Sequence, residues 1–441
     1  MQWWQMVRRK SGQFHDTLQT FQSAYAQWEL ENSTFILSRR KKLLLLLLLP
    51  VILGVGVEAA LATELIGGDK AYAPSFITTE MFIGSLFVGM VAGLITGCIG
   101  AGGGFVITPA LMSIGVRGIM SVGTDQFHIF AKGIMGTALH RKLGNVNFWL
   151  AVWFVAGSLL GVTLGTGLNK SIYERSPALS DAFISAVYVF MLGILGAYAL
   201  YDYLSLRRAE AAQKAQAQTT TRVARTLQSM KIPPYVKFDQ DIVPGGRRIP
   251  VYPVILCGFI VGFIAAIMGV GGGFLTFPMF VYGLGVSTFT TVGTDILQII
   301  FTAGYASVQY AISGFVFYSL TMGLLLGSLV GVQIGAMVTK VVKGAVIRGF
   351  YALAIFAGFI NRACVLPEKL SGAGYISLAP AAGKLLSAIG TVIFFALVSG
   401  FALWVLASFL RNVGKIRAEQ AALAGVPVAS GRTEQALEST R

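Results

Sequence analysis

Charged residues are scarce in this chain. Only 12% of the 441 residues are charged, about half the share found in average soluble proteins, and 55% are hydrophobic. This balance excludes a water-soluble globular protein. Apolar runs of about twenty residues recur, whereas the strict alternation of outer-membrane barrel strands is missing. The sequence therefore predicts an all-α polytopic membrane protein.

Cysteine is also scarce, with three residues that lie far apart, Cys98, Cys257 and Cys364. Their spacing excludes a disulfide framework and a cysteine metal motif. The sequence contains no other metal-ligand spacing and no activated nucleophile. We therefore expect a protein that is not an enzyme and that uses no cofactor and no metal.

Acidic residues are fewer than basic ones, 19 against 34, which gives a net charge of +15. An excess of this size is found in nucleic-acid-binding proteins, but here the basic residues cluster beside apolar runs, as in SRRKK at residues 38–42. Such clusters indicate the cytoplasmic ends of membrane helices and contact with anionic lipid. We expect the lipid bilayer as a partner, and no nucleic acid.

The apolar runs and polar gaps divide the chain into seven parts. In order, we expect a cytoplasmic N-terminal region, 1–42, which could form an interfacial helix; an additional transmembrane helix, 43–66; a first transmembrane repeat, 81–203; a cytoplasmic linker, 204–249; a second transmembrane repeat, 250–366; a final transmembrane helix, 383–408; and a cytoplasmic tail, 409–441. A signal peptide is the alternative for 43–66, but 42 residues precede it, which favours a retained helix. The basic residues then predict a bacterial inner-membrane protein with both termini in the cytoplasm.

The strongest signal is an internal repeat. Segments of the first half match segments that lie 169 (266 − 97) or 170 (292 − 122) residues later in the chain. Three pairs of segments match: GCIGAGGGFVITP (97–109) with AIMGVGGGFLTFP (266–278), VGTD (122–125) with VGTD (292–295), and GSLLGVTLG (157–165) with GSLVGVQIG (327–335). The predicted topology enters the first copy from outside and the second from the cytoplasm, so we expect two inverted-topology repeats with flanking helices.

Both glycine motifs interrupt apolar segments, which predicts broken or re-entrant helices. A dinucleotide-binding fingerprint would need a strand before it and a soluble βαβ unit, and neither is present in the sequence. In a broken helix, free backbone N–H groups can bind an anion. The predicted substrate-binding glycines are Gly102, Gly103, Gly104, Gly271, Gly272 and Gly273.

These repeated segments, with HRKLGNV at 140–146, resemble the TauE/SafE sulfite exporters over about residues 81–366. The resemblance implies a secondary transporter that exports sulfite or a short organosulfonate, driven by the proton gradient, and it adds His140 to the candidates for proton coupling. The chain departs from the family pattern at Asp125 and Asp295, where Ser is common.

Three ionisable residues share one face of the segment after the first motif. Asp125, His128 and Lys132 are spaced i, i+3 and i+7, and Asp295, Gln298 and Thr302 take the same spacing in the second copy. Charge inside a membrane is costly. For Lys132 the alternatives are contact with an oxyanion, an ion pair with an aspartate of the other repeat, or snorkelling to the membrane surface.

Each aspartate has two interpretations. Because it follows Gly-Thr at the expected start of a helix, it could be an N-cap. It could also couple protons to transport, since a carboxylate repels an anion unless it is protonated. His128 could relay protons or be a packed histidine. The predicted substrate contacts are, besides the glycines, Thr124, Thr294, Lys132 and Gln298, and the proton-coupling candidates are Asp125, Asp295, His128 and His140.

The sequence supports other functions as alternatives. The same scaffold could take up or export another small anion such as thiosulfate or a carboxylate. It could also be a channel, or a membrane-embedded sensor or subunit whose N-terminal region and linker bind a partner. The sequence gives no oligomeric state.

Overall fold

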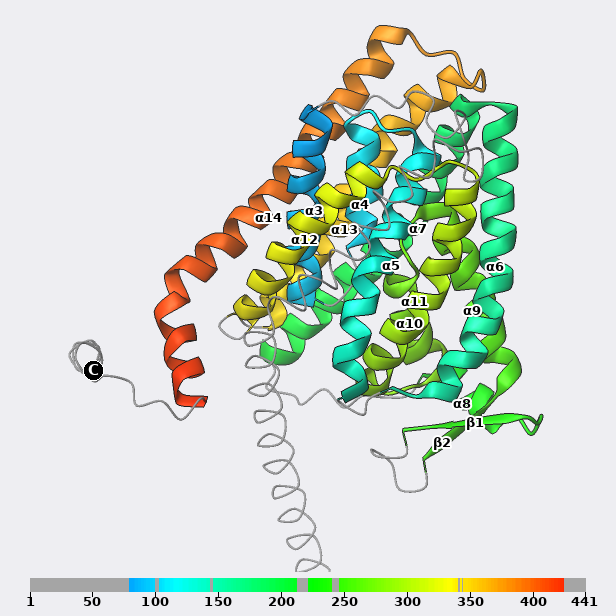
Figure 1. Ribbon diagram of the computed structural model, residues 1–441, viewed down its shortest axis with the longest axis vertical. Helices are drawn as coiled ribbons and strands as arrows, with labels where there is room; N and C mark the ends of the chain where they lie inside the picture. The colour runs from blue at the N-terminus through cyan, green and yellow to red at the C-terminus, as the bar shows by residue number, and fades with distance from the viewer. Residues whose placement is uncertain are drawn as a thin grey trace, which may run out of the picture. The chain divides into compact units, whose positions relative to one another are not determined.

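The computed structural model describes residues 79–99, 103–142, 146–211, 221–239, 246–339, 342 and 344–423, so the predicted N-terminal region and the helix at 43–66 lie outside the described residues. Within these ranges the chain is almost entirely helical (Figure 1). Seven helices are long and apolar enough to cross a membrane: α3 (Thr79–Ile99), α6 (Phe148–Arg175), α7 (Pro177–Ala211), α9 (Val251–Met268), α12 (Tyr318–Thr339), α13 (Gly344–Gly372) and α14 (Pro380–Leu423). The predicted all-α polytopic membrane fold is confirmed.

Two further long helices and two short apolar ones complete the helical bundle. The long ones are α5 (Gly118–Lys142) and α11 (Thr288–Ile312). The short ones are α4 (Gly104–Ser113) and α10 (Gly273–Pro278), which continues as the π-helical segment η3 (Met279–Leu284). With 10 residues, α4 is about 15 Å long, half the thickness of a bilayer core. Neither short helix can cross a membrane alone.

The first glycine motif forms a re-entrant hairpin. Gly103, which precedes α4, lies against Ala92 and Thr96 in the second half of α3. After α4 the chain reaches Gly115, which lies against Met81 at the start of α3. Helix α4 therefore runs back along α3 to the end from which α3 began. The sequence predicted a broken or a re-entrant helix at this motif, and the observed packing is that of a re-entrant helix.

The second motif repeats this arrangement. Gly272, which precedes α10, lies against Val261 and Ala265 in the second half of α9. After η3, the carbonyl of Gly285 accepts a hydrogen bond from Arg247, which stands four residues before α9 begins. In Figure 1, α3 begins at the upper end of the bundle and α9 at the lower end. The two hairpins enter from opposite ends, as inverted repeats require.

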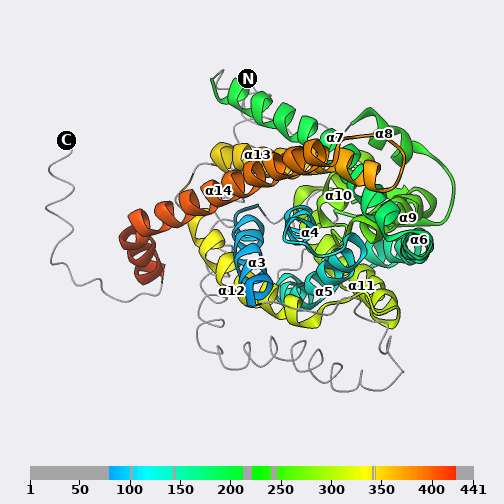
Figure 2. The same cartoon turned by 90° about the horizontal axis from the view of Figure 1, so that it is seen from above.

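Packing between the halves is reciprocal. Helix α3 packs on α12 and α6 packs on α9, with α5 and α11 side by side between the two pairs (Figure 2). The close contacts use glycines in both directions: Gly89 and Gly93 of α3 and Gly327 and Gly331 of α12 at one pair, Gly157 and Gly161 of α6 and Gly258 and Gly262 of α9 at the other. Small residues allow such backbone contact between membrane helices, where apolar surface gives no preference for protein over lipid.

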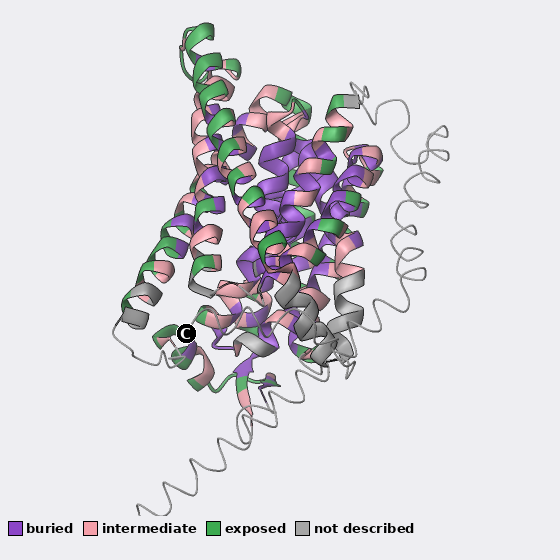
Figure 3. Ribbon diagram, turned by 90° about the vertical axis from the view of Figure 1, so that its left-hand side faces the viewer, coloured by how far each residue is buried: buried purple, intermediate pink, exposed green. Residues whose placement is uncertain are grey.

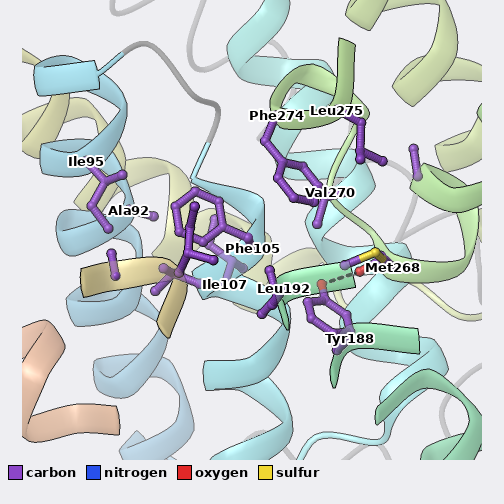
Figure 4. Packing of buried hydrophobic residues seen from close by; sticks show 14 of the residues in the cluster. Ala92, Ile95, Phe105, Ile107, Tyr188, Leu192, Met268, Val270, Phe274 and Leu275 are labelled. Carbon is purple, nitrogen blue, oxygen red and sulfur yellow. Dashed lines mark hydrogen bonds between the residues drawn. The ribbon is translucent and has the colours of Figure 1, made fainter. Parts of the chain in front are cut away.

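The buried residues concentrate in the middle of the bundle (Figure 3). There Phe105, at the start of α4, and Phe274, at the start of α10, have ring centroids 6.0 Å apart (Figure 4). Both are almost completely buried. The two glycine motifs, 169 residues apart in the sequence, therefore meet at the centre of the molecule.

The linker carries structure that the sequence did not indicate. Within the predicted linker, 204–249, α7 continues to Ala211, and α8 (Arg222–Ser229) is followed by an antiparallel pair, β1 (Tyr235–Phe238) and β2 (Arg247–Pro250). The Gln228 side chain of α8 donates a hydrogen bond to the carbonyl of Leu284, at the end of η3 (2.8 Å). The linker is thus packed against the second repeat.

Candidate functional site

Both half-helices begin after a glycine in the left-handed region. Gly103 has φ 73° and Gly272 has φ 89°, values that favour glycine over any other residue. The N–H groups in the first turn of a helix have no intrahelical carbonyl to bind. Because Phe105 and Phe274 belong to these first turns, the positive ends of α4 and α10 lie near each other at the centre.

A buried carboxylate lies against each of these helix starts. Asp125 Oδ2 is 3.2 Å from the position that a Cβ atom on Gly104 would take, and Asp295 Oδ2 is 3.2 Å from the same position on Gly273. Both aspartates are at least nine-tenths buried. The last glycine of each motif therefore leaves the space into which the carboxylate of its own repeat fits.

Neither aspartate is an N-cap, so that interpretation was wrong. Helix α5 begins at Gly118 and α11 at Thr288, which places each aspartate seven residues inside its helix (125 − 118 and 295 − 288). Ser287 caps α11 instead, by accepting from the N–H of Thr290. The glycine before each Thr-Asp suggested a helix start, but in α5 this glycine, Gly123, allows close approach to Phe315 of the other repeat.

Asp125 and His128 form a polar pair inside the first repeat. Thr108 of α4 donates to Asp125 Oδ2 (3.1 Å). Asp125 Oδ1 is buried, has no hydrogen-bond partner among the described residues, and lies 3.6 Å from His128 Nδ1. The other ring nitrogen of His128 is 2.7 Å from Ser328 Oγ of α12. A fully buried histidine thus connects the carboxylate to a helix of the opposite repeat.

Lys132 extends from α5 toward the start of α4. Its Nζ donates to Thr96 Oγ1 of α3 at 3.0 Å. The same hydroxyl oxygen lies 3.1 Å from the position that a Cβ atom on Gly103 would take. The Lys132 side chain therefore lies beside the first glycine motif. The spacing in the sequence predicted only that Lys132 shares a helix face with Asp125 and His128.

The equivalent site of the second repeat has neutral partners. Gln298 donates to Asp295 Oδ1 (2.8 Å) and to Thr276 of α10 (3.1 Å). Thr302, at the position of Lys132, donates to Gln298 and contacts Ser158 of α6 (2.8 Å each). The two half-sites therefore differ in charge. In the part of the chain that the structure describes, no three His, Cys, Asp or Glu side chains gather as metal ligands would.

The two threonines of the VGTD segments join the repeats. Thr124 Oγ1 accepts from the N–H of Phe317, and Thr294 Oγ1 accepts from the N–H of Asn147, both at 3.0 Å. Each threonine thus positions the start of a helix of the opposite repeat. That these threonines also contact the substrate stays a prediction. Two further candidates cannot be placed, since Gly102 lies outside the described residues and the His140 side chain is not described.

The carbonyl end of α9 is closed by four side chains that the sequence did not single out. They donate to four successive carbonyls, a requirement of any buried helix end. The donors are Gln126 to Ala265, Tyr310 to Ala266, Asn169 to Ile267 and, visible in Figure 4, Tyr188 to Met268. Because the last carbonyls of α9 all accept hydrogen bonds, the negative end of α9 is neutralised. The positive start of α10 is then the main electrostatic feature where the second helix is broken.

Arg362 of α13 is a second residue that sequence reasoning missed. It is 1% exposed, and its guanidinium donates to the carbonyl of Pro109 (3.2 Å) and the hydroxyl of Ser113 (2.9 Å) at the end of α4. A cationic side chain at a helix C-terminus can donate hydrogen bonds to the free carbonyls of the helix, and it interacts favourably with the helix dipole. The only sequence signal was an Asn-Arg pair within an apolar segment. Arg362 fixes the C-terminal end of α4 to the second repeat.

We expect Arg362→Lys to lower thermal stability in detergent. The ammonium of lysine cannot reproduce the planar fork of donors, so at least one charged hydrogen bond, about 1.5–3 kcal/mol, is lost. Lys170→Met, at a half-exposed position of α6, is the control and should leave the melting temperature nearly unchanged. Equal melting temperatures for Arg362→Lys and the parent would contradict this role.

Comparison with known proteins agrees with the geometry. The family model described as sulfite exporter TauE/SafE matches residues 85–362, more than half of the chain. Two probable membrane transporter proteins of Bacillus subtilis, YjnA and YunE, are each 26% identical, over 58% and 59% of this chain and 89% of their own length. A probable membrane transporter protein of Methanocaldococcus jannaschii is 25% identical over 52% of this chain and 78% of its own. No solved structure matches.

The family match covers both glycine motifs, both VGTD segments and Arg362. It covers the helices from α3 to most of α13, the same elements that build the central site. The matching relatives are named as transporters, and seven helices here can span a bilayer. This chain is a multi-pass membrane transporter that belongs to the sulfite exporter TauE/SafE family.

Proposed function

We propose that the chain exports a small sulfur oxyanion, sulfite or a short organosulfonate, across the bacterial inner membrane together with protons. One observation carries the proposal: the buried carboxylate of Asp125 lies against the positive start of α4, where Lys132 also reaches. Helix starts with free N–H groups bind anions, and a lysine adds a compact positive charge. A place that suits a carboxylate group also suits another small oxyanion.

Asp125 and the substrate would compete for this positive helix start. While Asp125 is ionised, it interacts with the helix start and repels a second anion. When Asp125 takes up a proton, the first-turn N–H groups and Lys132 become available to the substrate. Proton binding therefore favours anion binding. His128, 3.6 Å from Asp125, offers a route for the proton, and Asp295 is the second candidate carboxylate.

The charge balance favours export of divalent sulfite, whereas a monovalent organosulfonate that leaves with one proton carries no net charge and gains nothing from the membrane potential. A divalent sulfite that leaves with one proton carries one net negative charge outward. An inside-negative potential favours this movement by about 2.3 kcal/mol per charge for each 100 mV, whereas the pH gradient opposes it. The basic linker and terminal segments support a cytoplasmic location for both termini. The family description as a sulfite exporter supports the same direction.

The two re-entrant hairpins support alternating access. They enter from opposite ends, and Phe105 and Phe274 meet between them. In transporters with inverted repeats, rocking of one half against the other exposes such a central site first to one side and then to the other. The reciprocal glycine contacts of α3 with α12 and α6 with α9 offer smooth surfaces for this motion.

The substrate class is tested by a thermal-shift screen of purified protein. Sulfite and short organosulfonates should raise the melting temperature more than thiosulfate or carboxylates, because ligands that bind the folded state stabilise it. A larger shift with thiosulfate or a carboxylate would assign another anion. If no anion gives flux in reconstituted vesicles, the sensor or subunit alternative is favoured.

We expect Lys132→Met to weaken substrate binding. Loss of one charged hydrogen bond, about 1.5–3 kcal/mol, corresponds to a roughly 10- to 100-fold higher KM for flux into proteoliposomes. Lys132→Arg keeps the charge and should recover part of the affinity, while Lys170→Met controls for loss of a lysine elsewhere. An unchanged KM in Lys132→Met would remove Lys132 from the site.

A further inference from the structure

Two aspartates each bind the first turn of a central helix, at opposite ends of the bundle. Asp181 of α7 accepts from the N–H of Gly118, where α5 begins (2.8 Å). Asp239, which follows β1, accepts from the N–H of Ser287, just before α11 (2.9 Å). In the repeat, Gly118 corresponds to Thr288 (118 + 170), the residue that follows Ser287. In Figure 1, α5 begins at the upper end and α11 at the lower end.

Each aspartate also pairs with a basic residue from another element. Lys369 of α13 lies 3.8 Å from Asp181, and Arg247 of β2 lies 3.8 Å from Asp239. The basic partners are about one-third exposed, 35% for Lys369 and 32% for Arg247, and ion pairs of this length that are open to solvent contribute little to overall stability. They are therefore suited to a contact that forms and breaks during function. We name Asp181 with Lys369 the α7 latch, and Asp239 with Arg247 the linker latch.

The two latches are not products of the duplication. The second copy has Tyr351 where the first has Asp181 (181 + 170). The missing carboxylate comes instead from the linker, whose Asp239 has a left-handed backbone (φ 54°), which aspartate tolerates better than most residues. A backbone N–H at the start of the central helix is thus bound by a carboxylate in both repeats, one residue out of register, although the carboxylates come from unrelated segments.

The linker latch is the more complete of the two. The Asp239 side chain is fully buried and also accepts from the hydroxyls of Ser287 and Thr290, both at 2.6 Å. The Asp181 side chain is 19% exposed. Charge-assisted hydrogen bonds are stronger than neutral ones. The end of the bundle that carries the linker is therefore closed more firmly than the other end.

We propose that these two latches are the gates of the transporter: each must release the start of its central helix when that end opens, and the linker latch biases the protein against opening at the linker end. This inference rests on the proposed transport function, because it assigns the gating of the same central site. Asp181, Asp239, Lys369 and Arg247 are positioning residues, since they act through α5 and α11. The linker is then part of the gate and not a passive connection.

The test measures access at each end with a water-soluble maleimide. Ser121 and Thr291 are equivalent, fully buried, and lie within the first turn of α5 and of α11. Each is replaced by cysteine in a protein whose Cys98, Cys257 and Cys364 are alanine. Asp239→Asn should raise the labelling rate of the cysteine at 291 severalfold and leave that at 121 unchanged or lower. Asp181→Asn should do the reverse.

The proposal is overturned if the Asn substitutions leave the labelling rates of both reporter cysteines unchanged. It is also overturned if a substitution accelerates the labelling of both reporters equally, because that indicates a general loosening of the protein. If Asp239→Asn fails to fold, Arg247→Gln, which removes the ion pair and the hydrogen bond to the carbonyl of Gly285 but keeps Asp239 on Ser287, gives the same comparison. Labelling needs no substrate. End-specific labelling without anion flux would therefore leave the gates standing and remove the proposed function, whereas flux without end-specific labelling would do the opposite.

Discussion

Gly161→Ala should destabilise the protein, although glycine-to-alanine changes within helices usually stabilise. A Cβ atom at Gly161 of α6 would lie 2.7 Å from the backbone nitrogen of Phe263 and closer still to the carbonyl of Phe259. These neighbouring atoms belong to the backbone of α9 and cannot rotate away, so the helices must separate. Forcing atoms into a packed interface costs about 1–3 kcal/mol. We expect a lower melting temperature and less monodisperse protein in detergent.

Gly167 provides a control on the same helix, because nothing lies within 4 Å of the position that its Cβ atom would take. Gly167→Ala should be neutral or stabilising by up to about 1 kcal/mol, since alanine is the better helix former. The two substitutions make the same chemical change and differ only in what faces the new methyl group. If both variants melted at the parent temperature, the close α6–α9 contact would be contradicted.

Asp125→Asn should uncouple transport from protons. Asparagine keeps the size of the side chain but cannot take up a proton, so the driving force of a pH gradient is lost. Each coupled proton allows about a tenfold accumulation per pH unit. In proteoliposomes with acid outside, the parent should accumulate an organosulfonate, which stays ionised throughout, whereas Asp125→Asn should only equilibrate it. Exchange of labelled for unlabelled substrate should persist.

Asp295→Asn is the matched variant, since Asp295 takes the same place at the start of α10 but has Gln298 and Thr276 around it. Retained accumulation in this variant assigns coupling to Asp125 alone. Loss in both assigns it to the pair of carboxylates. Retained accumulation in both variants, with normal exchange, would mean that neither aspartate couples protons and that the competition mechanism is wrong.

Local signals in the sequence predicted much of the fold. Hydropathy located the membrane-spanning helices from α3 onward, because a membrane selects for uninterrupted apolar length. The glycine motifs predicted the broken helices. The spacing of Asp125, His128 and Lys132 predicted a polar face inside the bundle. These features depend on residues close together in the chain, and so they can be read without knowledge of the partner helices.

Other features depend on contacts between distant segments. The start of α5 at Gly118 was missed because Gly123 resembles a helix breaker, and only its packing against Phe315 explains it. Arg362 was missed because its partners in α4 lie some 250 residues away, and Asp239 because a linker of polar composition gave no sign of docking on Ser287.

The sequence by itself determined the class of protein, the duplication and the positions of the membrane helices, since composition and periodicity report directly on the solvent around each segment. Only the tertiary structure decided that each motif is re-entrant, that a carboxylate faces each half-helix start, and that the linker closes one end. Hydrogen bonds and close packing between segments far apart in the chain decide those features. Local patterns in a single sequence do not show which distant residues come into contact.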